Sequence, residues 1–556
     1  MRADRSLIAS ETPADVAVVG SGPVGLKLAL DLADAGMKVV LIESGRDGTN
    51  TATQALSDAL IVNEASHAPM SLAVKRAFGG TSNLWGGRAV PLDDIDFADR
   101  SFAPNTRWPI SQSEISRWYG DACRFLDCGA ATFEDRVFAE IEAQAQGLKL
   151  DRLERWCANP RLRAVHGKRA QNHPNLRIAF GTTVLRINID VDGRSVRDLL
   201  VDIDGMRDRI RARSYIIAAG GLETTRLLLA SRAANPRLFN GPNGPLGRNY
   251  MGHIFGSIAD IVFDRPNLDR QFDFTLDASG RYVRRRFALD APTQLKHSVL
   301  NMSAWPEPPP LDDPSHGSGI LSLAYLALRA PILGSLLSPE AIRLRKIGSG
   351  PLRLGAHSAN ILKDLLGSAR LGSKFLLARY GSRVRLPGFF VPSKAHRYAF
   401  QYHGEHLPCA ESRVRLTERT DAFGQPRLAI DLRFKETDAA SVVRTHELMD
   451  ERMRATGIAH LDFGVPPEER VAKVLAQASD GFHQIGLARM SSNEREGVVD
   501  TNARVYGTSN LFLAGSAIFP SSGQANPTLT AVALAARLAV HLKTAQLSLP
   551  ARAIAS

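Results

Sequence analysis

The N-terminal part of the chain has a regular hydrophobic pattern between residues 15 and 43. Val16, Val18 and Val19 belong to a short apolar strand, and residues 38–42 form a second one. Residues 26–35 between them suit a helix that ends at Gly36. The pattern therefore predicts a strand, a glycine-rich turn, a helix and a second strand, in that order.

Further along the chain, the pattern changes to alternation. Apolar and polar residues alternate over 185–191, which predicts a half-buried strand. Strands follow over 196–203 and 209–218, so we expect a three-stranded meander. Residues 414–417 and 427–432 flank a turn and predict a hairpin.

Two helices are predicted in the parts of the chain between these strands. Ser111 and Glu114 have the spacing of a capping box, so a helix should run from there to about Asp127. Residues 437–456 suit another helix. Strands and helices together predict a mixed α/β fold.

Composition limits the class of protein. The chain has 556 residues, of which 44% are apolar and 23% charged, so it can fold into two or three globular units. Four cysteines, none in a C-x-x-C pair, argue against a disulfide framework, a structural zinc and an iron–sulfur cluster. We therefore expect no metal.

The net charge of +12 is concentrated in one segment. Residues 320–397 contain thirteen basic and two acidic residues, a net charge of +11, among many leucines and isoleucines at helical spacing. The segment suits a solvated helical insertion, a surface that contacts an anionic membrane or lipid, or one that contacts an acidic protein. No motif for nucleic-acid binding accompanies the charge, so we expect no nucleic-acid partner.

The chain shows no clear targeting signal. No apolar stretch of signal-peptide type precedes the first strand. The longest apolar run, 320–337, contains Arg329 and Pro331 and so does not suit a membrane-spanning helix. We expect a soluble, cytoplasmic protein, with a peripheral position at the inner membrane as the alternative.

The first chemical motif lies in the N-terminal turn. Gly20, Gly22 and Gly25 fit G-x-G-x-x-G between a predicted strand and a predicted helix, where a pyrophosphate can approach the backbone and the helix N-terminus. Glu43 ends the second strand and can accept hydrogen bonds from both ribose hydroxyls. These features predict dinucleotide binding, and the acid favours FAD or NAD over NADP.

Two more regions contain residues suited to ligand binding or catalysis. The loop 79–87 has four glycines with hydroxyl and amide side chains between them, which suits a backbone lying against a ligand. Near the C-terminus, Asn526 and Pro527 suit the start of an apolar helix whose positive end could stabilise an anionic flavin. His483 precedes this helix, but a lone histidine is more often structural than catalytic.

Taken together, these segments resemble the glucose–methanol–choline (GMC) oxidoreductase family of flavoenzymes. The resemblance spans nearly the whole chain. Within the family, the loop 79–87 followed by Trp108-Pro109-Ile110 is similar to the pyranose-oxidase and sugar-dehydrogenase branch. The other segments that carry the resemblance are the fingerprint at 20–25, Ala218-Ala219-Gly220-Gly221 with Thr224 and Leu227-Leu228, Gly247-Arg248-Asn249, and the block from His483 to Asn526.

The resemblance implies a fold of two domains. A Rossmann-type FAD-binding domain would be discontinuous and comprise residues 1–100, 175–255 and 470–550. A substrate domain with a large, mainly antiparallel sheet would comprise 101–174 and 256–469, including the basic insertion at 320–397.

The resemblance also implies the site. His483 would take the hydroxyl proton of an alcohol while hydride moves to the flavin N5, and Asn526 would orient the hydroxyl. A histidine suits this role because its ordinary pKa lies near working pH. The implied cofactor contacts are Gly20, Gly22, Gly25, Glu43, Gly80, Thr81, Asn83, Gly86, Val184, Ala219, Gly220, Gly515, Ser516, Pro527 and Thr528.

Departures from the family pattern refine these expectations. Leu84 stands where some pyranose oxidases have a histidine that tethers FAD, so we expect non-covalent FAD. Only Cys157 lies near the region where related sugar dehydrogenases carry a cysteine-rich loop, so no cluster is expected. Leu487 and Ser491 replace a threonine and a glycine near His483. His403, Glu405 and His406 are weaker candidates for substrate contacts.

The expected activity is FAD-dependent oxidation of a secondary alcohol, a sugar or glycoside hydroxyl, to a carbonyl. Oxygen, a quinone or a redox protein would accept the electrons. Two alternatives stay open. One is a flavin-containing lyase without net redox chemistry on the same scaffold. The other is a dehydrogenase docked on a membrane that acts on a lipid-linked glycan.

Overall fold

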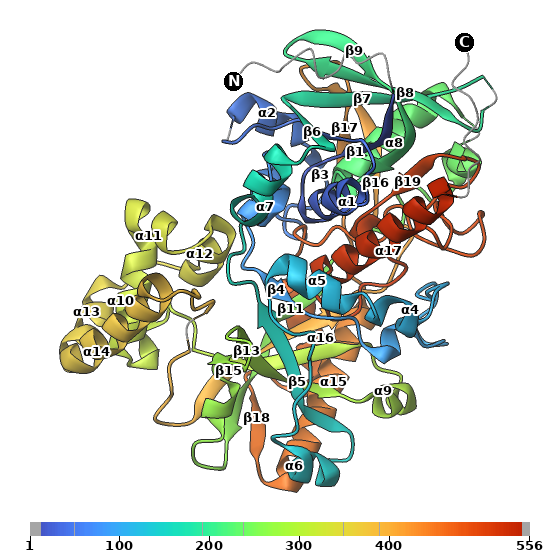
Figure 1. Ribbon diagram of the computed structural model, residues 1–556. Helices are drawn as coiled ribbons and strands as arrows, with labels where there is room; N and C mark the ends of the chain where they lie inside the picture. Colours follow the sequence, from blue (N-terminus) through green and yellow to red (C-terminus); the bar gives the residue numbers. More distant parts are fainter. Residues whose placement is uncertain are drawn as a thin grey trace.

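The computed structural model describes residues 13–48, 50–191, 193–236, 238–348, 350–388 and 390–547. The segment in which we expect no signal peptide lies mostly outside these ranges. Figure 1 shows two large parts stacked on each other and a helical lobe at one side.

A five-stranded parallel sheet forms the core of the first part. Its order is β19-β10-β1-β2-β6, so strands from three distant stretches of the chain lie side by side. Helix α1 (Pro23–Asp34) connects β1 to β2 and buries its leucines, as the N-terminal pattern predicts. The strands are β1 (Ala14–Val19), β2 (Val39–Glu43), β6 (Leu176–Phe180), β10 (Ala212–Ile217) and β19 (Leu511–Leu513).

A large antiparallel sheet forms the second part. Its order is β18-β11-β15-β14-β13-β5-β4, with β12 paired to β13, and every pairing is antiparallel. The long helix α15 (Glu436–Thr456) packs on it and confirms the helix predicted there. The strands are β4 (Arg88–Ala89), β5 (Leu148–Trp156), β11 (His253–Phe263), β12 (Thr275–Leu276), β13 (Tyr282–Leu289), β14 (Met302–Glu307), β15 (Arg397–Glu405) and β18 (Ala459–Phe463).

Two small sheets complete the strands. The predicted hairpin is present as β16 (Arg413–Thr420) and β17 (Pro426–Asp431), joined by β3 (Leu60–Ile61). Strands β7 (Thr182–Ile189), β8 (Val196–Ile203) and β9 (Met206–Ile210) form the meander. The prediction of one strand over 209–218 was wrong. The chain leaves the meander after Ile210, and β10 enters the parallel sheet.

The remaining helices cover both sheets. Ser111 caps α4 through the predicted box with Glu114, but the helix breaks before α5 starts. Helix α17 packs against α1 and closes the parallel sheet on one face (Figure 1). The helices are α2 (Thr51–Gln54), α3 (Met70–Ala73), α4 (Gln112–Ser116), α5 (Tyr119–Leu126), α6 (Ala139–Gln144), α7 (Leu162–Asn172), α8 (Gly221–Ala234), α9 (Ala291–His297), α16 (Arg470–Gln477) and α17 (Thr528–Leu547).

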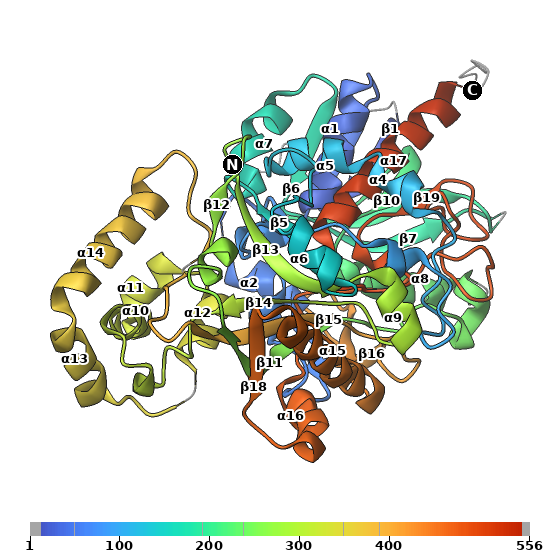
Figure 2. The ribbon, with the colours of Figure 1, turned by 90° about the horizontal axis from the view of Figure 1, so that it is seen from below.

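The basic insertion folds into a helical lobe, which we define as residues 319–381. Figure 2 shows it projecting from the large sheet. Its hydrophobic core is small: Leu321 and Tyr325 of the lobe are buried together with Leu311, which precedes it. Its helices are α10 (Gly319–Arg329), α11 (Pro331–Leu337), α12 (Glu340–Ile347), α13 (Leu354–Lys363) and α14 (Leu365–Leu376), followed by a π-helical turn, Leu377–Gly381.

Within the described residues, no single helix has the length and apolar character needed to cross a bilayer. The pair α10–α11 would meet that requirement together, but the chain bends by 108° between them. The bend falls at Ala330 and Pro331, because proline cannot continue the hydrogen-bonded ladder of α10. The prediction that 320–337 is not one spanning helix agrees with this geometry.

Both domains of the expected fold are present as structural parts, and the mixed α/β class is confirmed. Strands of the parallel sheet come from all three segments assigned to the FAD domain. The residue limits of the two domains stay a prediction.

Candidate active site

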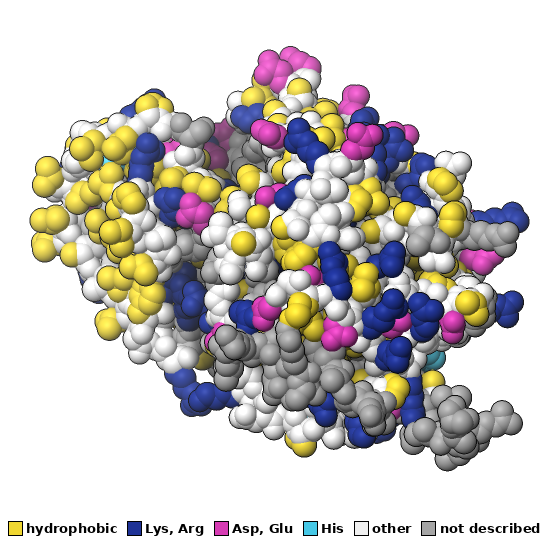
Figure 3. Space-filling view, turned by 90° about the horizontal axis from the view of Figure 1, so that it is seen from above, with side chains coloured by type: hydrophobic (Ala, Val, Ile, Leu, Met, Phe, Trp, Pro, Cys, Tyr) yellow, Lys and Arg dark blue, Asp and Glu magenta, His cyan; other side chains and the backbone are white. Residues whose placement is uncertain are grey.

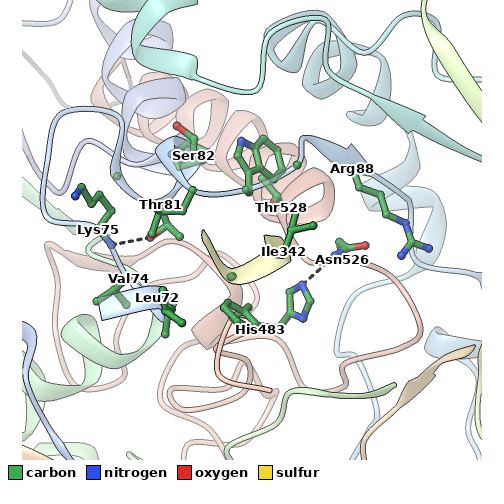
Figure 4. A pocket seen from close by; sticks show the side chains of 18 of the residues that line it. Leu72, Val74, Lys75, Thr81, Ser82, Arg88, Ile342, His483, Asn526 and Thr528 are labelled. Atoms are coloured by element: carbon green, nitrogen blue, oxygen red, sulfur yellow. Dashed lines mark hydrogen bonds between the residues drawn. The ribbon is translucent and has the colours of Figure 1, made fainter. Parts of the chain in front are cut away.

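A large cavity of about 1170 Å³ lies where the two sheets and the lobe meet. Its wall combines the ends of β1 and β2, the loop 79–87, the start of α17, strands of the large sheet and helices of the lobe. Figure 4 shows Thr81, Arg88, His483, Asn526 and Ile342 around one space. Segments far apart in the sequence therefore build one site.

The predicted fingerprint forms a cradle at one end of this cavity. Gly20 has φ +96°, a left-handed conformation that favours glycine. A Cβ on Gly25 would lie 1.9 Å from the Gly20 carbonyl oxygen, so Gly25 permits close packing of helix and strand and does not line the cavity. A Cβ on Gly22 would meet no atom within 4 Å. Gly22 caps α1 and leaves its N-terminus open to a negatively charged group.

Glu43 lies at the end of β2, as predicted, and lines the cavity. Its carboxylate accepts hydrogen bonds from the Ser21 amide and hydroxyl at 3.1 and 2.5 Å and from the Gly45 amide at 2.6 Å. These bonds fix the carboxylate at the position where a ribose would approach. A carboxylate oxygen has more than one lone pair, so it can still accept ribose hydroxyls.

The glycine-rich loop 79–87 lies against this cradle. A Cβ on Gly80 would come within 2.8 Å of the Gly22 Cα, so the two glycine segments touch through backbone. Thr81 and Gly86 line the cavity, as does Leu84. Asn83 does not: its amide donates to the carbonyls of Phe78 and Gly80 at 3.0 and 2.8 Å and so braces the loop.

The remaining predicted cofactor residues are all in the cavity wall. They come from four separate segments, at β7, at the end of β10, after β19 and at the start of α17. Helix α17 begins at Thr528, later than predicted, so the Asn526 side chain is directed at His483 and not at the helix backbone. These lining residues are Val184, Ala219, Gly220, Gly515, Ser516, Pro527 and Thr528.

His483 and Asn526 meet in the cavity, as the sequence predicts. Asn526 Nδ2 lies 2.9 Å from His483 Nε2 (Figure 4). On its other side, His483 Nδ1 lies 2.9 Å from Asp480 Oδ2. A carboxylate there accepts a hydrogen bond from Nδ1–H, which leaves Nε2 as the acceptor that faces the cavity. Asn526 Oδ1 is buried and has no hydrogen-bond partner, so it can accept a bond from a ligand.

Sequence reasoning missed Asp480. Burial alone would raise the pKa of its carboxyl group, but His483 and His253 beside it hold this pKa well below its ordinary range. Asp480 also accepts the His253 amide at 2.7 Å. An acidic residue three positions before the histidine was the available signal, but spacing alone does not distinguish such a pair from a loop residue.

Two further imidazoles lie beside His483. His253 and His403 stack with ring centres 4.2 Å apart, and His253 meets His483 edge-on at 4.6 Å. Burial lowers the pKa of His253 to about 4 and lowers that of His403 well below its ordinary value. Both rings therefore stay neutral near pH 7, so a proton taken up by His483 is not repelled by a second positive charge in the cluster. The expected absence of a metal stays a prediction.

The three weaker candidates for substrate contact separate in the structure. His403 lines the cavity. Glu405 forms a buried ion pair with Arg100, at 2.6 and 2.7 Å. His406 accepts the Gly252 amide at 3.1 Å and lies 2.8 Å from the Arg433 carbonyl oxygen. Glu405 and His406 do not line the cavity, so the expectation of substrate contact is corrected for both.

The residues present fit an FAD molecule. The open position at Gly22 and the carboxylate of Glu43 suit a pyrophosphate and a ribose, and the unpartnered Asn526 oxygen belongs to a residue of the same cavity wall. The start of α17 would face the flavin ring. All four cysteines are buried and free. Non-covalent attachment stays a prediction that rests on Leu84.

Comparison with known families gives two matches. A model described as "FAD dependent oxidoreductase" matches residues 15–290, and one described as "GMC oxidoreductase" matches residues 408–535. The first match includes the cradle and the glycine-rich loop. The second includes His483 and Asn526.

Among curated relatives, paromamine 6'-oxidase of Streptomyces fradiae is 31% identical over 580 residues, 94% of this chain and 90% of the relative. C-glycoside 3-oxidase of Arthrobacter globiformis is 33% identical, but the match spans about a fifth of each chain, 118 residues. Among solved structures, a fungal aryl-alcohol oxidase has a TM-score of 0.52 at 14% identity, with 96% of this chain and 100% of that chain covered. This last likeness shows the fold alone.

Proposed function

Because the chain belongs to the GMC oxidoreductase family and is an FAD-dependent oxidoreductase that acts on alcohols, we propose that it oxidises a secondary hydroxyl of a sugar or glycoside to a carbonyl. The observation that carries the proposal is the Asp480–His483–Asn526 arrangement at the cavity wall. The names of the sugar-oxidising relatives support the substrate class.

When bound in the cavity, FAD would supply the acceptor for the hydride of the carbinol carbon. The protein supplies the base and the orientation. The substrate hydroxyl takes a place next to His483 Nε2 and donates its hydrogen bond there. Asn526 Nδ2, which lies 2.9 Å from Nε2, then donates to the hydroxyl oxygen. His483 and Asn526 bond each other in the structure, and in the substrate complex they would become the acceptor and the donor for one hydroxyl.

Asp480 keeps the imidazole in the productive tautomer. Its carboxylate accepts a hydrogen bond from Nδ1–H, so Nε2 is free to take the hydroxyl proton. The negative charge of Asp480 then stabilises the imidazolium that results. The neutral rings of His253 and His403 add no opposing charge. Both rings also fill the space beside His483 and restrict its rotation.

The test is anaerobic mixing of the holoenzyme with a panel of sugars, glycosides and simple alcohols, followed by the flavin absorbance. Bleaching by one or more glycosides is the expected result. Reoxidation of the bleached enzyme by oxygen or by a quinone then identifies the electron acceptor. Failure of the whole panel to bleach the flavin would defeat the proposal, and product formed while the flavin stays oxidised would indicate a lyase.

A further inference from the structure

The helical lobe differs from the rest of the surface in its exposed apolar side chains. The lobe holds 15 of the 25 large hydrophobic residues that are exposed in the described chain, although it is a small part of it, and all but Leu323, Leu333, Ile342 and Leu376 lie outside the cavity wall. Leucine and isoleucine dominate this group. The most exposed members are Leu366 at 85%, Ile332 at 79%, Leu362 at 74%, Leu336 at 71% and Leu377 at 69%. Single exposed leucines are ordinary, but a concentration of this size marks an interaction surface.

Basic side chains lie among these apolar ones. Figure 3 shows hydrophobic side chains gathered over the lobe with Lys and Arg beside them. Two acidic residues oppose them in the lobe, and one of these, Glu340, is already bonded to Arg343. The exposed basic residues of the lobe are Arg353, Lys363, Arg370 and Lys374, besides Arg345 in the cavity wall. The surface is thus apolar and cationic together, so its partner must be apolar and anionic.

We propose that the lobe docks the enzyme on an anionic lipid bilayer. The most exposed leucines come from the junction of α13 and α14, from α11 and from the π-helical turn, so they form separate points on several helix ends. A protein partner needs one matching surface, whereas a bilayer accepts separate apolar points together with nearby cations. Charge complementarity between the lobe and acidic headgroups favours the bilayer.

The inner side of the same lobe supports this orientation. Leu328 and Leu333, with Leu337, line the cavity, and Phe375 and Leu376 line it from α14. The lobe is therefore the boundary between the proposed bilayer and the catalytic cavity. A substrate with an apolar part would meet leucines on both sides of that boundary.

Co-flotation of the holoenzyme with vesicles tests the docking. We expect binding to phosphatidylglycerol/phosphatidylcholine vesicles and at least tenfold weaker binding to pure phosphatidylcholine, with weakening by salt. The triple variant Leu362→Ser, Leu365→Ser, Leu366→Ser should lose at least tenfold in binding. The matched variant Leu60→Ser, Leu276→Ser, Leu295→Ser, at exposed positions outside the lobe, should bind like the parent.

A charge variant separates the two contributions. Lys363→Gln, Arg370→Gln, Lys374→Gln should remove the preference for anionic vesicles, whereas Arg136→Gln, Lys168→Gln, Arg211→Gln on other exposed surfaces should keep it. Absence of vesicle binding by the parent protein would overturn the proposal. So would self-association through the lobe, seen by light scattering and abolished by the leucine variant, without vesicle binding. Neither result depends on the oxidation proposed above.

A second, independent observation concerns the charge of the cavity wall. Arg88 and Arg284 share the buried carboxylate of Glu154, and Lys346 pairs with Glu307. Arg345 lies over the Phe255 ring and donates to Gln401 at 2.7 Å, and no carboxylate of the described residues lies within ion-pair distance of it, although its charge acts on Glu307. Four cations thus face two carboxylates. Lys346, Arg284 and Arg345 outweigh burial and hold the pKa of Glu307 well below its ordinary range.

We infer that this wall binds an anionic group of the substrate, a phosphate or a carboxylate. The assignment of this anion to the substrate rests on the proposed function, whereas the anion site itself does not. The cations come from β4, β13 and α12, away from the cradle at Gly22 that suits the cofactor pyrophosphate. Arg345 and Lys346 both line the cavity, so an unneutralised charge is available to a ligand there.

Anion binding to the holoenzyme can be followed by perturbation of the flavin absorbance at constant ionic strength. Inorganic pyrophosphate and malonate serve as the phosphate and carboxylate probes. We expect at least one to bind, with affinity reduced at least tenfold by Arg345→Gln and unchanged by Arg353→Gln, an exposed lobe residue outside the cavity. No binding of either probe, or equal binding by the Arg345→Gln variant, would overturn the inference, whatever the substrate panel shows.

Discussion

The catalytic centre and the helical lobe line the same cavity, but their side chains are used differently. Asp480 is fully buried, and His483 is held by hydrogen bonds to Asp480 and Asn526. The lobe has a small hydrophobic core and exposes leucines at more than two thirds of their surface. In the centre the side chains bond one another and leave the single Asn526 oxygen for a ligand, whereas in the lobe whole apolar side chains are left for another molecule.

This contrast predicts different responses to mutation, and the centre should show the largest. His483→Ala should lower the rate of flavin reduction by about 10²–10⁴-fold, because the group that takes the hydroxyl proton is lost. FAD should stay bound, since His483 is not part of the cradle formed by Gly20, Gly22 and Glu43. Stopped-flow reduction and the ratio of flavin to protein absorbance measure the two quantities. A rate within threefold of the parent would contradict the assignment.

Asp480→Asn should have the next largest effect. The loss of the carboxylate should slow flavin reduction by about 10²-fold, because Nδ1 loses the partner that fixes the tautomer. The acid limb of the pH profile should move to lower pH, since a protonated imidazole is then less favoured. The pH dependence of stopped-flow reduction measures this shift. An unchanged profile with a reduced rate would indicate a purely structural role.

Substitutions at two leucines, one in the core of the parallel-sheet part and one in the lobe, compare these regions directly. Leu28→Ala in α1 removes a fully buried side chain and should lower the free energy of unfolding by about 2–5 kcal/mol. Leu366→Ala, at a position 85% exposed, should change it by less than about 0.5 kcal/mol. Thermal unfolding of both variants beside the parent is the measurement. A large loss for Leu366→Ala would show that the lobe surface is internal to some assembly.

Buried histidines outside the lobe make the stability of the protein depend on pH. Burial lowers the pKa of His253 and of His446 to about 4. The unfolded chain takes up these protons near pH 6.5, so stability should fall as the pH is lowered from 6.5 to 4. The loss should be about 1 kcal/mol per pH unit for each histidine. His446→Gln, remote from the cavity, should flatten the curve of unfolding temperature against pH. An equally steep curve would show that His446 does not contribute to this pH dependence.

The sequence could predict the cradle because its positions are set by backbone geometry. Gly20 and Gly25 follow from a turn and a close packing that no other residue permits, and Glu43 follows from the end of a strand. The pairing of His483 with Asn526 depends on a meeting of segments 43 residues apart, which only the family resemblance supplied. That pairing is present in the structure.

Other features could not be predicted, for physical reasons. Asp480 is a loop residue until the fold buries it beside His483. Glu405 and His403 lie two residues apart on β15, but Glu405 meets Arg100 while His403 lines the cavity, so neighbouring positions have different environments. The stretch 209–218 suits one strand, and the fold divides it between two sheets. The sequence predicted a basic helical insertion but not which of its leucines would be exposed.

The order of strands in the parallel sheet also has a consequence for synthesis of the protein. Strands β1 and β2 leave the ribosome first, whereas β19, which pairs with β10 at the edge, is among the last segments made. At the usual speed of translation, roughly 25–95 s separate them. During this time β10 lacks its edge partner, and the sheet lacks the cover of α17. A nascent chain that stops before Leu511 would lack both elements, together with Asn526, and could neither close the cofactor half nor turn over.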